Sequence, residues 1–173
     1  MFAELSRPIV SLSEAQAFVR VETGEEEALL AGLIRSASAI CEEFLNQVII
    51  VRPFQENVDG SGEWQRLDIA PVRSIGGAMY RTAGTPLELL PSDTYETDID
   101  RDGGGCIRLP QTARCVVSGT AGLSLDQNGV PEPIRQGVIR LVAHLFSGRD
   151  GGGGEPPTIV TALWRPYRRL VLG

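Results

Sequence analysis

One periodic stretch constrains the fold of this chain more than any other part of its sequence. Between residues 29 and 48, apolar side chains recur at steps of three and four, the spacing of one face of an α-helix. This face consists of Leu29, Leu30, Leu33, Ile34, Ala37, Ile40, Cys41, Phe44, Leu45 and Val48. The sequence therefore predicts a long amphipathic helix that buries one side against other elements.

Capping signals mark the start of this helix and of a shorter one before it. Thr23 and Glu26 have the spacing of a capping box, and the carboxylates of residues 25–27 suit the positive end of a helix dipole. Ser11 and Glu14 repeat the spacing ahead of a short apolar face. We predict a helical pair within residues 11–47, preceded by an irregular arm over residues 1–10.

The sequence then changes to short β-rich runs separated by turn residues. In the second run, Trp64, Arg66 and Asp68 alternate with Gln65, Leu67 and Ile69, as in a sheet with one solvated face. Turns are predicted at residues 59–62 and 81–85. A small antiparallel β insertion is therefore expected over residues 48–122, with candidate strands at 48–57, 63–69, 72–81, 87–90, 94–99, 105–109 and 113–119.

A third helix is predicted over residues 131–147, because Pro131 and Pro133 suit a first helical turn and an apolar face follows them. Six of the nine residues 149–157 are Gly or Pro, which predicts a linker. The predicted class is α+β: a helical layer of three main helices, with the β insertion between the second and third. We expect one domain over residues 1–148 and a separate C-terminal segment over residues 158–173.

The charge, the apolar runs and the cysteines of the sequence argue against several classes of function. The net charge of −6 argues against a nucleic-acid binder, which normally carries a basic face. We expect neither a signal peptide nor a membrane span, because residues 1–10 lack an apolar core and no apolar run is long enough to cross a bilayer. The three cysteines lack metal-type spacing and indicate reduced, packed side chains in a protein made in the cytoplasm.

Few residues offer catalytic chemistry. His144, the single histidine, and Cys41 both fall on helices where packing explains them, so no catalytic residue is predicted. Residues 98–102 begin like a calcium loop, but Leu109 stands where the bidentate Glu belongs, and a hairpin turn is the simpler explanation. We predict no metal and no cofactor. A small metal-dependent or hydrolytic enzyme using Asp98 to Asp102 and a monomeric binding module remain the alternatives.

The C-terminal segment has the composition of a binding hot spot, since Trp and Arg are enriched at interface centres. The candidate partner-binding residues are Ile159, Leu163, Trp164, Arg165, Tyr167, Arg168, Arg169 and Leu170. Two arrangements are open: a docking arm that reaches a partner across the linker, which we favour, or a final helix folded back on its own domain.

Several short stretches follow one another in a particular order: residues 12–21, the helix that begins at residues 29–34, and residues 67–75, 90–95, 119–122 and 130–146. Together they resemble the head–tail connector proteins (adaptor or head-completion proteins) of tailed double-stranded DNA bacteriophages and the related gene transfer agents, and the likeness is strongest over residues 130–146. It covers roughly residues 11–148. Gly137, where the family more often has Ala, and the Gly-rich stretch before the tail depart from the pattern.

This resemblance implies a structural protein rather than an enzyme, located in a virion or phage-like particle at the head–tail interface. Members of the family form a ring, often of twelve copies, beneath the portal protein. The ring continues the DNA channel towards the stopper or tail-completion protein, and the C-terminal segment commonly engages the portal. Double-stranded DNA is expected to pass through without sequence-specific binding, and no membrane is involved.

Overall fold

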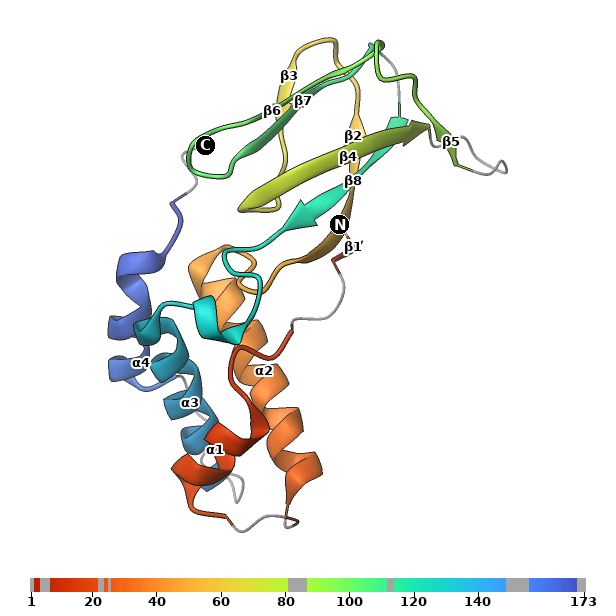
Figure 1. Cartoon of the computed structure of the whole chain (residues 1–173). Helices are drawn as coiled ribbons and strands as arrows, with labels where there is room; N and C mark the ends of the chain where they lie inside the picture. The colour runs from red at the N-terminus through yellow and green to blue at the C-terminus, as the bar shows by residue number, and fades with distance from the viewer. Residues whose placement is uncertain are drawn as a thin grey trace. The chain divides into compact units, whose positions relative to one another are not determined.

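The structure is a computed structural model that describes residues 2–3, 7–21, 24, 26–80, 87–111, 114–148 and 156–170. Helices and antiparallel strands both occur, so the predicted α+β class is confirmed (Figure 1). The chain divides into two compact units. A β unit comprises Met1–Leu5 and Val51–Leu123, and a helical unit comprises Ser6–Ile50 and Ser124–Gly173.

The helical unit is built on α1 (Leu12–Val19), α2 (Glu27–Leu45) and α3 (Glu132–Ser147). The predicted apolar face of α2 is the buried one, with Leu30, Ala37 and Cys41 fully shielded from solvent. Ile134, Val138 and Val142 bury the facing side of α3. Apolar burial of this kind is the main favourable term holding such helices together. Within the described ranges, none of the helices combines the length and the apolar content that crossing a bilayer requires.

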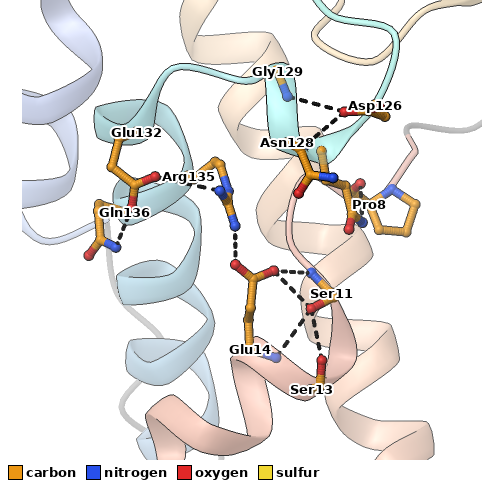
Figure 2. Close-up of polar contacts among 11 residues, drawn as sticks. Pro8, Ser11, Ser13, Glu14, Asp126, Asn128, Gly129, Glu132, Arg135 and Gln136 are labelled. Atoms are coloured by element: carbon orange, nitrogen blue, oxygen red, sulfur yellow. Dashed lines mark hydrogen bonds and ion pairs between the residues drawn. The ribbon is translucent and has the colours of Figure 1, made fainter.

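The capping box predicted for the first helix is confirmed (Figure 2). The Ser11 hydroxyl accepts a bond from the Glu14 backbone N–H at 3.2 Å, and the Ser11 N–H donates to the Glu14 carboxylate at 2.9 Å. The same carboxylate pairs with Arg135 of α3, whose other terminal nitrogen lies 3.5 Å from Glu132. One side chain therefore caps α1 and ties it to α3.

The start of α2 differs from the prediction. Thr23 lies outside the described residues, and Glu26 is the residue before the helix, in a left-handed conformation with φ 53° and without a side-chain cap. Glu27 supplies the returning bond instead, because its carboxylate accepts from the Gly24 N–H at 3.1 Å. The helix thus begins later than its capping signal indicates.

The chain leaves and re-enters the helical unit at adjacent points. Ser124 N–H donates to the Ile49 carbonyl at 2.8 Å, and Ile50 forms an isolated parallel bridge with Ser124. Residues 48–50 are buried here without belonging to a strand, so the strand predicted from residue 48 begins only at Arg52. The apolar β-branched run packs in the helical core instead of pairing in a sheet.

Among the described residues of the β unit, the strands form two antiparallel sheets. The first has the order β1-β2-β8-β4-β5 and the second the order β3-β7-β6. The strands are β1 (Phe2–Ala3), β2 (Arg52–Asp59), β3 (Trp64–Arg66), β4 (Val72–Tyr80), β5 (Glu88–Leu89), β6 (Glu96–Ile99), β7 (Gly105–Arg108) and β8 (Arg114–Ala121). Residues 81–85, predicted as a turn between strands, lie outside the described part of the chain.

The alternation of apolar and polar residues along the strands determines which face of each sheet is buried. Along β2, buried and exposed residues alternate without interruption, and Phe54 and Val58 point inward. The predicted wet face over residues 64–68 is also confirmed, because Trp64, Arg66 and Asp68 are exposed while Leu67 and Ile69 are buried. A side-chain period of two therefore positions the core of the β unit.

The described residues of the predicted irregular arm, 2–3 and 7–10, are more ordered than the sequence indicates. Phe2 and Ala3 pair with Gln55 and Phe54 as an edge strand of the five-stranded sheet. Further along, Ile9 and Val10 are buried, and Ile9 N–H donates to the buried Ser38 hydroxyl at 3.1 Å. Pro8 prevents a helix here, but it does not prevent packing.

Glu14→Gln tests the link between α1 and α3. Hydrogen bonds between Ser11 and the Glu14 carboxylate lower the pKa of Glu14 below its ordinary value of 4.5, although burial acts in the opposite direction. A carboxyl whose pKa falls on folding stabilises the fold above that value and loses the contribution as pH drops through the folded pKa. We expect Glu14→Gln to lower the free energy of unfolding by about 1 kcal/mol at pH 7. The free energy of unfolding of the variant should also fall less steeply below pH 4.5, because the variant has no carboxyl to protonate at this position.

Urea unfolding measured between pH 7 and pH 3 checks this expectation. Glu132→Gln is the matched control, because the Glu132 side chain is 64% exposed and shares the same arginine. An equal effect of the two substitutions would contradict the role given to Glu14.

Candidate functional site

The C-terminal segment is the candidate site indicated by the sequence. It forms α4 (Thr158–Trp164) and the short helix η2 (Arg165–Tyr167). Two prolines precede α4, and Pro157 occupies its N-cap, which marks where the helix begins. Figure 1 shows α4 lying along α3. Of the two arrangements left open by the sequence, the structure has the folded-back one.

Trp164 anchors this segment in the helical unit. Its side chain is fully buried, and its indole N–H donates to the Ile134 carbonyl at 3.1 Å. The ring lies directly over Gly137 of α3, where an added Cβ would be 2.7 Å from two ring carbons and would clash with the indole nitrogen. Gly137 thus provides the space that the indole occupies.

Contacts with the end of α2 hold the rest of the segment. The rings of Phe44 and Trp164 have centroids 5.7 Å apart, and the Arg168 guanidinium lies 5.5 Å from the Phe44 centroid. Two hydrogen bonds extend this contact: Arg169 N–H donates to the Leu45 carbonyl at 2.9 Å, and Gln47 donates to the Tyr167 carbonyl at 2.6 Å. The segment is therefore fixed by aromatic packing and by backbone hydrogen bonds together.

The eight candidate residues are divided by this packing. Trp164 is in the interior, so in this conformation it positions the segment and presents no surface to a partner. Leu163, Tyr167 and Arg169 are half-buried. The exposed members are Ile159 at 55%, Leu170 at 77%, Arg165 and Arg168. We call these four residues the exposed tail face; they combine two apolar side chains with two positive charges.

Sequence reasoning missed the partner of Trp164. Glycine in the middle of a helix is unfavourable by about 1 kcal/mol relative to alanine, so a glycine at this position of α3 needs a local reason. That reason is the indole ring packed against it. A mid-helix glycine together with a tryptophan further along the chain was the available signal.

Asp98 and Ile99 lie in β6, and residues 100–104 form the hairpin turn that joins it to β7. One oxygen of Asp100 accepts the N–H groups of Asp102 and Gly104, at 2.9 and 2.6 Å, and the other pairs with Arg66 at 2.8 Å. In the part of the chain that the structure describes, no cluster of three His, Cys, Asp or Glu could hold a metal ion. The carboxylate is thus used to shape the turn.

The other groups considered for chemistry are also structural. Cys41 is fully buried on α2, and burial strongly raises the pKa of its thiol, which disfavours the nucleophilic thiolate. A hollow of about 250 Å³ in the β unit is lined by Arg108 and Glu96, but these two charges pair with each other.

Comparison with known proteins shows full-length likenesses among solved structures. The sequence matches no protein-family model and no curated protein. A chain in the neck of an empty gene transfer agent (GTA) particle, computed with C6 symmetry, has a TM-score of 0.79 and 25% sequence identity, covering 100% of this chain and 98% of that one.

Two further structures have the same fold. A chain of the native GTA virion has a TM-score of 0.77 and 23% identity, with 99% of this chain and 97% of that chain covered. A chain in the neck of a native GTA particle, computed with C12 symmetry, has a TM-score of 0.73 and 22% identity, with 100% and 98% covered. The likeness is thus to virion components, and it agrees with the sequence resemblance at the level of a phage-like neck protein.

A double-mutant cycle at Gly137 and Trp164 tests the anchor. Trp164→Ala is expected to lower the free energy of unfolding by about 3–5 kcal/mol, because it empties a buried site. Gly137→Ala should cost about 1–3 kcal/mol in the natural chain, because the new methyl group clashes with the indole. With Trp164→Ala already present, Gly137→Ala should instead stabilise by up to about 1 kcal/mol through helix propensity.

Denaturant unfolding of the four proteins at one temperature measures the cycle. Equal effects of Gly137→Ala in both backgrounds would show that the glycine is not there to admit the ring.

Proposed function

We propose that this protein is a structural neck component of a phage-like particle: a head–tail adaptor that assembles as a ring on the portal protein and extends the DNA channel towards the tail. The observation that carries the proposal is the match of the entire chain to a neck chain of a GTA particle, at a TM-score of 0.79 and 25% identity. The connector-like sequence stretches support it independently. The protein acts within the particle, at the head–tail interface.

The copies are expected to form a closed ring. The related neck structures were computed with C6 and C12 symmetry, and twelve copies satisfy both. The partners of each copy are then further copies of the same chain, the portal on one side of the ring and a stopper or tail-completion protein on the other. The net charge of −6 suits a channel for double-stranded DNA, because like charge disfavours retention of the passing polymer.

Portal docking is assigned to the exposed tail face. Burial of Ile159 and Leu170 against a partner would remove two exposed apolar side chains from water, which is favourable. Arg165 and Arg168 would add charge complementarity to an acidic patch on the portal. The buried Trp164 and the backbone groups of Tyr167 and Arg169, which bond to Gln47 and Leu45, hold in place the segment that carries these residues.

A double substitution on the exposed tail face tests the docking role. Ile159→Asp combined with Arg165→Glu should reduce incorporation into particles at least about tenfold, since it removes an apolar contact and reverses a charge. The melting temperature should stay unchanged, because both side chains are exposed. Incorporation is measured as the amount of protein in purified particles made by cells whose own copy of the gene is deleted.

Leu125→Asp combined with Arg140→Glu is the matched control. It makes the same chemical changes at exposed positions of the helical unit outside the tail segment. Full incorporation of the tail variant would remove the docking role from this face. Absence of the natural protein itself from particles would contradict the neck function.

A further inference from the structure

We propose that the three-stranded sheet is the seam between neighbouring copies of this chain, with β3 of one copy lying beside β6 of the next. The inference rests on the proposed ring and adds the surfaces that join its members. Within the described residues, β3 and β6 are the two outer strands of that sheet, on either side of β7. An outer strand has unpaired backbone groups along one side, and these can pair with another chain.

β6 is unusually open for a strand of a packed sheet. All four of its residues, Glu96 to Ile99, are exposed. Alternate residues of a strand face opposite sides, so a strand packed on a core normally buries every second one. Ile99 faces the same side as the fully buried Ile107 of β7, yet it is 37% exposed. β6 therefore lies beyond the edge of the core, and both of its faces are available to a second copy.

β3 on the opposite side has complementary chemistry. Trp64 is 46% exposed, and the Arg66 side chain is 54% exposed. The Arg108 guanidinium covers the Trp64 ring from one side, 5.6 Å from its centroid. Tryptophan and arginine are the residues most enriched at interface centres. β6 offers acidic side chains in return, Glu96 and Asp98.

The register of the sheet aligns these groups. Trp64, Arg108 and Glu96 form one row across the three strands, and Arg66, Cys106 and Asp98 form the next row on the same face. Both outer strands are antiparallel to β7, so they run parallel to each other. Repeating the sheet by rotation places Arg66 beside Asp98 of the second copy and continues both rows without a shift.

The Arg66 guanidinium can donate hydrogen bonds to a second acceptor at this seam. Arg66 donates through one terminal nitrogen to Asp100 at 2.8 Å, while a guanidinium has five N–H donors in all. Protection of the β6 edge against unwanted pairing would explain its acids, but not an exposed tryptophan on the opposite edge. Because β3 meets β6 and not another β3, the contact is head-to-tail, and such a contact forms a ring when the rotation from copy to copy closes.

Disulfide trapping tests the seam directly. Gln65 and Thr97 flank Ile107 in one row of the sheet, so the proposed seam brings Gln65 of one copy beside Thr97 of the next. Particles carrying Gln65→Cys with Thr97→Cys, mildly oxidised, should give a ladder of dimers and larger species on non-reducing gels. Each single substitution is the matched control and should give no ladder, because the reciprocal thiol is missing.

Charge reversal provides a second measurement that does not depend on the new cysteines. Asp98→Arg should reduce incorporation about tenfold, and adding Arg66→Asp should restore part of it, because the two charges across the seam are exchanged while the bond from Arg66 to Asp100 is lost. Asp59→Arg is the control, being an exposed aspartate at the end of β2 in the five-stranded sheet. Oxidised particles that contain the double-cysteine protein without a ladder, or an Asp98→Arg protein that incorporates normally, would overturn the seam and leave the neck function standing. Failure of the natural protein to incorporate would contradict both.

Discussion

The packing of Trp164 over Gly137 determines how the helical unit ends and what it can present to a partner. Because the indole is fully buried and bonded to the Ile134 carbonyl, the C-terminal segment lies on α3 and the end of α2. This placement leaves some of the remaining tail residues half-buried and others exposed to solvent. A composition typical of a binding hot spot thus serves two purposes: an aromatic anchor inside, and an apolar, basic face outside.

The two units supply different kinds of contact in this account. In the helical unit, the exposed tail face suits an acidic, partly apolar surface on another protein. In the β unit, the open outer strands of the three-stranded sheet suit further copies of the same chain. A ring component needs both kinds, since it must join its own copies around the axis and its neighbours along the axis. Two charged residues outside these surfaces have local roles instead: Asp100 shapes a turn, and Glu14 caps a helix.

Sequence reasoning succeeded where the determining contacts are local. The Ser11–Glu14 capping box joins residues three apart, and the alternation around Gln65 reflects the pleat of a strand, so both could be read from a short window. It failed where distant residues decide the outcome. Pairing of Phe2 with Gln55, and the burial of residues 48–50 in the helical core, depend on elements formed elsewhere in the chain. The burial of Trp164 likewise depends on Gly137, a residue of another helix.

The most direct test of the neck function is the mass of the purified protein by light scattering, first alone and then with portal-bearing particles that lack it. The account predicts a ring-sized assembly, either stable alone or formed when the portal is present. In both cases the protein should afterwards be bound to the particles. A protein that stays monomeric and remains unbound in the presence of such particles would contradict the account.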